Sequence, residues 1–291
     1  MKTSPAIPLI FLLLIPPLGS AFAQRSASIG DNAALRYWAA FAQMQDSAVS
    51  DQQAKELNTI LDGTAPYDDS KYKDLVDENK PALQTLHRAT ALPKCDWGLD
   101  YQLGEDVPVE YARKALALGR LNVLYVFHLL IAGDREGAVR TLVAGIRFSQ
   151  DVANGGSLFA TLAAKSLIVS HLRAVAFALH TAGFSAAQRS VLQKAIARLE
   201  PNGLDWQSAT KRDLESLSGR YSEGSATSVA LMQIVSSYLS ALSAPSELPS
   251  LKRVIENAPQ PLPHIIPNPA RVLEEKQDLT DKLMQVRSLL Q

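Results

Sequence analysis

Hydrophobic residues recur every three or four positions along most of the chain, which is the period of an amphipathic α-helix. One such stripe contains Ala34, Tyr37, Trp38, Phe41, Met44 and Ala48. Similar stripes follow over residues 51–62, 68–92, 135–153, 185–199, 204–222 and 226–243. Alternation with a period of two, the pattern of a half-buried strand, does not rise above chance. The pattern predicts an all-α protein built as an array of antiparallel helical hairpins.

Two helical stretches are apolar on nearly every face. From Leu121 to Ala132 few positions are polar, and over 158–182 the polar stripe is narrow. A helix that is apolar all round is surrounded by other helices, so these two are predicted to lie at the centre of the protein. The first is short for a membrane span, and Lys165 and Arg173 interrupt the second, so we expect no transmembrane segment in the mature chain.

Capping and breaking residues predict where the helices begin and end. Asp31 or Asn32, Asp134, Ser157 and Ser185 are suited to cap helices, and Gly133 and Gly183 to end them. Pro108 suits the first turn of the helix that reaches Ala132. Pro81 lies within the pattern over 68–92, and two arrangements fit it: two helices that meet near Lys80, or one kinked helix.

The composition changes at Ala244. Seven of the sixteen prolines lie between 245 and 269, and we expect this segment to be extended, with a polyproline-like conformation over 258–269. The predicted organisation is a helical domain over 24–243, the Pro-rich extended segment over 244–269 and an amphipathic helix over 270–291. That helix has one apolar side, formed by Val272, Leu279, Leu283, Val286 and Leu290. It is expected to pack on its own domain; the alternative is a partner helix or a dimer contact.

The first 23 residues have the features of a secretory signal peptide. Lys2 precedes an apolar run over 6–18, and Ala21-Phe22-Ala23 is a small-x-small cleavage site. The alternative, an uncleaved anchor, is disfavoured because the run is short and contains prolines. We therefore expect an exported protein of the periplasm or cell envelope, cleaved after Ala23.

The charge balance argues against one class of partner. The chain has 29 basic and 29 acidic residues, and loss of Lys2 leaves 28 basic residues, a net charge of about −1. Because no cluster of basic and aromatic residues occurs, nucleic acid is not expected as a partner. Cys95 is the only cysteine, so the chain forms no internal disulfide. We expect it to be a buried small hydrophobic residue; a reactive thiol or an intermolecular disulfide are the alternatives.

Two resemblances involve the middle of the chain. The helix, Gly133-Asp134 turn and helix over 112–150, with Ala138 at the start of the second helix, resemble a tetratricopeptide-type hairpin, which implies close helical packing at that turn. The loop Cys95-Asp96-Trp97-Gly98-Leu99-Asp100, followed by long helices, resembles a group of uncharacterised exported bacterial helical proteins. That resemblance implies the same fold and compartment, and no activity.

Several chemical motifs are incomplete. Ser208 and Lys211 match Ser-x-x-Lys, but the Lys-Thr-Gly strand of penicillin-interacting enzymes is missing, so both are expected on a solvated helix face. Asp96, Asp100, Glu105 and Asp106 make their loop acidic without the spacing of a calcium site, and Asp96 is expected to cap backbone amides while Trp97 fills the core. A cross-helix pair of His128 with His171 or His180 is open, although separate histidines are favoured.

These observations favour a non-catalytic interaction or scaffold module of the cell envelope. Its partner surface would be a groove between helical hairpins or the C-terminal helix, and we assign no catalytic, cofactor or metal residue. The alternative is an enzyme of unknown type with a polar site near Asp96, Trp97, His128 and Arg173. The enzyme hypothesis requires a pocket in which these groups converge, and it fails if each is satisfied locally.

Overall fold

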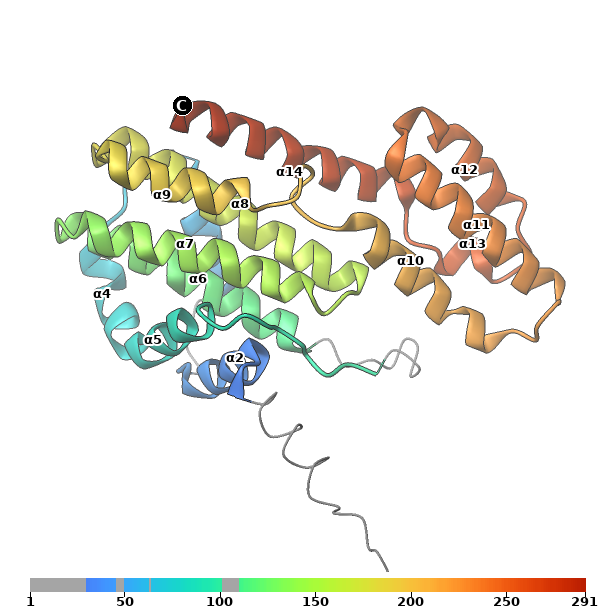
Figure 1. Ribbon diagram of the computed structural model, residues 1–291, viewed down its shortest axis with the longest axis horizontal. Coiled ribbons are helices and arrows are strands. Elements are labelled where there is room, and N and C mark those ends of the chain that lie inside the picture. The colour runs from blue at the N-terminus through green and yellow to red at the C-terminus, as the bar shows by residue number, and fades with distance from the viewer. Residues whose placement is uncertain (1–29, 46–49, 63, 101–109) are drawn as a thin grey trace, which may run out of the picture. The chain divides into compact units, whose positions relative to one another are not determined.

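The computed structural model describes residues 30–45, 50–62, 64–100 and 110–291, and over these residues it consists of helices and connecting loops without a β-strand (Figure 1). The all-α prediction is confirmed. The elements below all belong to the unit Asn32–Gln291. They are α2 (Ala33–Gln43), α3 (Asp51–Leu61), α4 (Asp69–Glu78), α5 (Lys80–Ala89), α6 (Glu110–Ile131), α7 (Arg135–Ala153), α8 (Leu158–Thr181), α9 (Ala186–Ala197), α10 (Trp206–Ser216), the 3-10 turns η2 (Ser218–Arg220) and η3 (Pro245–Glu247), α11 (Ala226–Ser243), α12 (Leu248–Glu256), α13 (Leu262–Ile265) and α14 (Pro269–Leu290).

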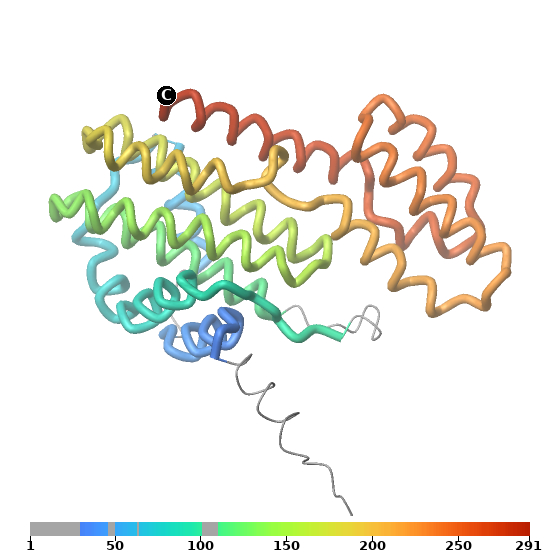
Figure 2. Tube along the Cα trace, viewed as in Figure 1, coloured from blue at the N-terminus to red at the C-terminus, as the bar shows by residue number. Residues whose placement is uncertain are grey.

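Helices α6, α7 and α8 pack on one another and form the centre of this unit (Figure 2). Small residues allow the close approach: a Cβ atom on Gly119 of α6 would lie 2.2 Å from Leu167 Cδ2 of α8. Gly133, at φ +78°, ends the turn after α6, and Asp134 Oδ1 accepts the Gly137 backbone N–H (2.8 Å) to cap α7. The predicted central hairpin is therefore present, and its tetratricopeptide-like character stays a prediction.

Within the described residues, three helices are long and apolar enough to cross a membrane, judged by length and composition alone: α6, α8 and α11. The apolar stretch from Leu121 was expected to be too short for a membrane span, but the helix that contains it begins at Glu110 and has 22 residues, so its length does not exclude a span. The most apolar windows of α6 and α8 are at least half buried inside the protein, against 33% for α11. The absence of a transmembrane segment stays a prediction.

The two prolines that bear on helix boundaries have different outcomes. Pro81 lies in the first turn of α5, and Asn79 separates α4 from α5, so the chain forms two helices there and not one kinked helix. The side chain of Asn79 is fully buried; its Nδ2 donates to Leu75 O (2.9 Å) and its Oδ1 accepts from the Gln45 N–H (3.0 Å). Pro108 lies outside the described residues.

The prediction that residues 244–269 are extended is wrong for most of that segment. It contains η3, α12 and α13, and only short connections between them are non-helical. Pro245, Pro249, Pro263 and Pro269 each occupy the first or second position of a helical element. At these positions a backbone N–H has no partner within the helix, so proline removes no hydrogen bond and its fixed φ favours the helix.

The C-terminal helix α14 packs on its own chain, as expected. Its apolar side is buried against α8 and α9 by Val272, Leu279, Leu283, Val286 and Leu290. Lys165 of α8 pairs with Glu275 (2.7 Å) and also with Asp278 of α14. The hydrophobic face that a partner helix would need is therefore already occupied.

Candidate functional site

The residues of the predicted polar site do not meet. Trp97 is buried and stacks on Tyr111 at the start of α6, with ring centroids 4.1 Å apart. His128 lies 17 residues further along the same helix, which corresponds to about 25 Å at 1.5 Å per residue. Asp96 caps its own loop, because its Oδ1 accepts the Gly98 N–H (2.9 Å). These two loop residues are thus far from the histidine with which they were expected to act.

His128 and Arg173 are each satisfied by a local partner. His128 Nδ1 lies 2.9 Å from Asp69 Oδ1 of α4, and Arg173 Nη1 lies 3.3 Å from Asp62 Oδ1 at the end of α3. Among the described residues, neither of these two lines the cleft described below, nor does Asp96 or Trp97. The observation required by the enzyme hypothesis, convergence of these four residues on one cavity, is not met.

The loop that contains Cys95 and Trp97 instead seals a buried cluster around Asp151 of α7. Trp97 Nε1 donates to the Asp151 backbone oxygen (2.7 Å), and Tyr37 Oη donates to Asp151 Oδ2 (2.7 Å). Arg147 Nη2 lies 3.2 Å from the other carboxylate oxygen, Oδ1. Burial nevertheless raises the pKa of Asp151 to about 6. The predicted structural role of Trp97 is confirmed.

Cys95 is half-buried beside the same cluster. Its Sγ lies 3.6 Å from the Asp151 backbone oxygen, and burial raises the pKa of the thiol above its ordinary value. A nucleophilic cysteine needs a lowered pKa, because the thiolate is the reactive form. The environment therefore favours the small hydrophobic role over the reactive thiol.

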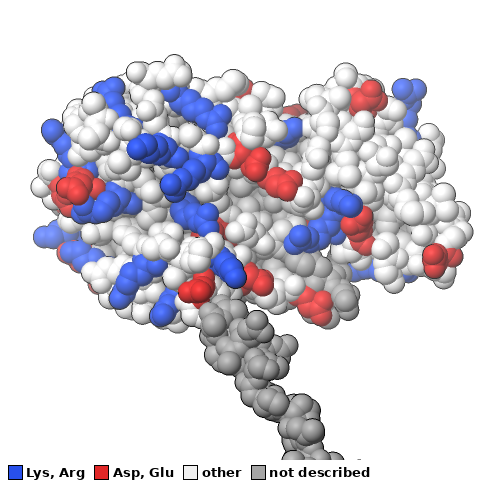
Figure 3. Space-filling view, in the orientation of Figure 1, with Lys and Arg blue, Asp and Glu red and all other residues white. Residues whose placement is uncertain are grey.

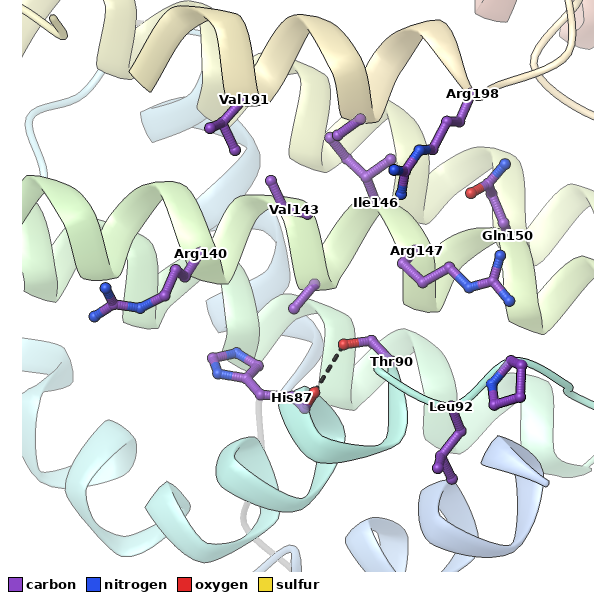
Figure 4. Close-up of a pocket in the computed structure, with 13 residues that line it drawn as sticks. His87, Thr90, Leu92, Arg140, Val143, Ile146, Arg147, Gln150, Val191 and Arg198 are labelled. Atoms are coloured by element: carbon purple, nitrogen blue, oxygen red, sulfur yellow. Dashed lines mark hydrogen bonds between the residues drawn. The ribbon is translucent and has the colours of Figure 1, made fainter. Parts of the chain in front are cut away.

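A cleft of about 600 Å³ opens between α5, α7 and α9 (Figure 4). This volume is in the range of sites that bind small molecules or short segments of a partner. Thirteen residues line it: His87, Thr90, Leu92, Pro93, Arg140, Val143, Ala144, Ile146, Arg147, Gln150, Val191, Ala195 and Arg198. None of these residues carries a carboxylate, so the charged groups of the lining are basic.

The three arginines of this cleft, which we call the cationic cleft, differ in their partners. Arg140 pairs with Glu136 one turn earlier on α7 (2.7 Å), and both side chains are well exposed. Arg147 is held by the buried Asp151. The side chain of Arg198, directly after α9, makes no hydrogen bond or salt bridge within the part of the chain that the structure describes. Basic side chains are visible over α7 and α9 on this face (Figure 3).

Apolar side chains form the wall between the arginines. Val143 and Ile146 come from α7, and Val191 comes from α9 across the cleft. Val191 is 47% exposed, so part of this wall is open to water. A ligand that neutralises the arginines and covers this wall would be anionic with an apolar portion.

A buried hydrogen-bond chain continues from His87 into the protein. His87 Nε2 lies 2.9 Å from Asn122 Oδ1, and Asn122 Nδ2 lies 3.0 Å from Thr141 O and 3.1 Å from His171 Nε2. His171 Nδ1 lies 2.8 Å from Leu167 O. Because a backbone carbonyl only accepts, these contacts fix His171 as the Nδ1–H tautomer, the Asn122 amide as donor to His171, and His87 as donor to Asn122.

Burial lowers the pKa of both histidines in this chain, to about 4 for His171. His128 pairs with Asp69 and His171 with Asn122, so the two histidines do not form the cross-helix pair that was left open. The third histidine in that hypothesis, His180, lies on α8 nine residues beyond His171. His128 and His171 thus have separate local partners, as the sequence favoured.

The Ser-x-x-Lys motif lies on the solvent-exposed face of an ordinary helix. Ser208 lies in the first turn of α10, capped by Asp205, and Lys211 pairs with Glu215 (3.7 Å) on an exposed face, as predicted. Of the acidic loop, Glu105 and Asp106 lie outside the described residues. Among the residues the structure does describe, no group of three or more His, Cys, Asp and Glu side chains could hold a metal ion.

Sequence reasoning missed the cationic cleft. Arg140 and Arg147 are seven residues apart, a spacing that places both on one face of a helix, so this pair was visible in the sequence. His87 and Arg198 come from distant parts of the chain, and nothing in the sequence joins them to that face. No family model, curated protein or solved structure matches this chain.

Proposed function

We propose that this protein is an exported, non-catalytic binding module of the cell envelope, and that the cationic cleft between α5, α7 and α9 takes an anionic partner. One observation carries the proposal. Arginines from both walls surround an apolar surface without a lining carboxylate, and the guanidinium of Arg198 has no partner among the described residues. Guanidinium groups bind carboxylates and phosphates by paired hydrogen bonds, which makes such a cleft suited to anions.

The composition of the cleft favours binding over catalysis. Its lining offers no carboxylate, thiol, serine or tyrosine, and its one hydroxyl, that of Thr90, donates to the His87 backbone oxygen (2.8 Å). His87 is the remaining candidate base, but its Nε2–H donates to the neutral Asn122 amide, and no carboxylate in the lining would stabilise the charged ring. The lining can therefore hold an anion, and it lacks the paired nucleophile and carboxylate-oriented base of a hydrolytic site.

The assignment to the envelope depends on the first 23 residues and on the resemblance of the Cys95–Asp100 loop to exported bacterial proteins. The experiment is fractionation of cells that express the full chain with a C-terminal tag. We expect the tag in the extracytoplasmic fraction on a chain that begins at Gln24. A chain that retains Met1, or that stays in the cytoplasm, would contradict export without bearing on the cleft.

The binding role is tested by capture from a cell-envelope extract of the source organism. The bait is the full-length protein, in parallel with the double variant Arg140→Gln/Arg198→Gln. Arg271→Gln, on the exposed side of α14, is the matched control for loss of charge. We expect a component that the protein and the control retain, that the double variant loses, and that about 1 M NaCl releases, since the Debye length is then about 3 Å. Equal recovery by all three baits refutes the proposal.

A further inference from the structure

The positive charges of the cationic cleft are spread along its length. Arg140 and Arg147 are seven residues apart on α7, which corresponds to about 10 Å along the helix axis. Their side chains extend in opposite directions along the helix, with Val143 and Ile146 between them (Figure 4). The guanidinium of Arg140 reaches Glu136 and that of Arg147 reaches Asp151, fifteen positions further along, so the two charges lie about 20 Å apart along the helix axis. Arg198 reaches from the α9 wall toward the Ile146 and Arg147 part of the cleft. A single compact anion cannot contact both ends.

The apolar wall between the charges also restricts the ligand. Val191 is 47% exposed, so a fatty acyl chain on this wall would stay partly in water. One lipid headgroup would also leave one end of the cleft without a counter-charge. A polypeptide segment meets both requirements, because it carries several anionic groups and needs only one small apolar side chain to cover the wall.

We propose that the partner presents an extended acidic peptide segment, with two carboxylates about 20 Å apart and an apolar residue between them. This inference rests on the proposed function of the cleft. In a polyproline II conformation six residues advance about 19 Å and complete two turns, so acidic residues at positions i and i+6 and the apolar residue at i+3 point to the same side. One carboxylate binds Arg147 and Arg198, the other binds Arg140, and the intervening side chain covers Val143 and Val191.

The test measures binding of short synthetic peptides to the full-length protein by fluorescence anisotropy. The probe is an acetylated and amidated Ala-Glu-Pro-Ala-Val-Pro-Ala-Glu-Ala, and its controls replace one or both Glu by Gln. Arg198→Gln and Arg140→Gln are compared with the distant Arg271→Gln. Thermal unfolding of each variant verifies that it folds. We expect each lost charge, on peptide or cleft, to weaken binding roughly tenfold, the size of one charge-assisted hydrogen bond. Arg271→Gln should leave binding unchanged.

Two further probes separate this inference from the proposed function. The first probe is vesicles that contain phosphatidylglycerol, and the second is inorganic phosphate. Each is titrated separately against the protein and the same variants. If either probe binds through Arg140 and Arg198 while the peptide does not, the peptide inference is overturned and the cleft remains an anion site. If the peptide binds equally to the protein and to its Gln variants, or its Gln analogue binds as well, the inference is also overturned. If no probe shows arginine-dependent binding, both proposals fail.

Discussion

Protonation of His171 should destabilise the protein, because the hydrogen bonds around it accept only the neutral ring. Its Nε2 accepts from Asn122 Nδ2, and its Nδ1–H is donated to Leu167 O. If Nε2 were protonated, its N–H would face the N–H of Asn122 Nδ2, and the hydrogen bond between them would be lost. Asn122 is unable to resolve this by turning its amide, because its oxygen would then face Thr141 O. The ring is also fully buried, so the charged form has no access to water.

The size of this effect follows from the pKa difference between the folded and unfolded states. The pKa of His171 is about 4 in the folded protein, against 6.5 for an exposed histidine. Because the pKa of His171 is lower in the folded protein than in the unfolded chain, the ring binds a proton more readily when the chain unfolds. The stability contribution of the neutral ring is therefore present above pH 6.5 and is lost as the pH falls toward 4. Linkage gives a loss of about 3 kcal/mol between pH 7 and pH 4. This is a substantial part of the free energy of unfolding of an ordinary domain.

The assay is urea unfolding of the protein and of His171→Gln at pH 7, 6, 5 and 4. Glutamine offers Asn122 an acceptor and does not titrate. The variant has a constant cost at every pH, and the informative quantity is the difference between the two free energies of unfolding. We expect that difference to shift against the original protein by about 3 kcal/mol from pH 7 to pH 4. A difference that stays constant, or that shifts toward the original protein on acidification, would refute the argument.

Three other predictions follow from buried contacts. Asp151→Asn should show the opposite pH trend: burial raises the pKa of Asp151 to about 6, so its stability contribution is present below pH 4 and is lost as the pH rises through 6. In the same urea assay the original protein should lose about 2.4 kcal/mol relative to Asp151→Asn between pH 4 and pH 7, and a pH-independent difference would contradict this. Gly145→Ala would place a Cβ atom 2.1 Å from His171 Nε2 and 2.6 Å from Asn122 Nδ2, so it should lower the free energy of unfolding by about 1–3 kcal/mol despite the better helix propensity of alanine. Gly219→Ala, with nothing within 4 Å of its Cβ position, is the control, and equal effects at the two sites would contradict the clash. Lys165→Met removes the cation that pairs with Glu275 and Asp278 of α14. It should lower the free energy of unfolding by about 1 kcal/mol and increase hydrogen exchange selectively within α14. Unchanged exchange there would show that apolar packing alone holds the helix.

Helix positions were largely predictable because their signals are local. The capping residues Asn32, Asp134, Ser157 and Ser185 each accept a backbone N–H of the first turn, as expected from residue type alone. The extended conformation expected for the Pro-rich segment was wrong because it was inferred from the number of prolines alone. The position of each proline relative to the start of a helix decides whether a helix can form. Pro249 and Pro263 occupy second positions, where they are compatible with a helix.

The polar contacts were less predictable because they depend on how distant segments meet. Asn122 and His171 are polar residues on largely apolar helices, but only the packing of α6 against α8 shows that they bond to each other. A separate local partner was favoured for His128, but the sequence did not identify it as Asp69, whose position follows from the break between α3 and α4. Nothing in the sequence indicated a role for Asp151, although Tyr37, Trp97 and Arg147 all bond to it.

Arg147 links that buried cluster to the cationic cleft. Its guanidinium pairs with Asp151, which also accepts the Tyr37 hydroxyl and holds Trp97 through its backbone oxygen. Arg147 is therefore oriented before any ligand arrives, and loses little conformational entropy on binding. It also shares its charge with Asp151, so the net attraction for an anion must come from Arg198 and from the weakly paired Arg140. The cleft thus combines one fixed arginine, which favours a particular ligand geometry, with two adaptable arginines that supply the charge.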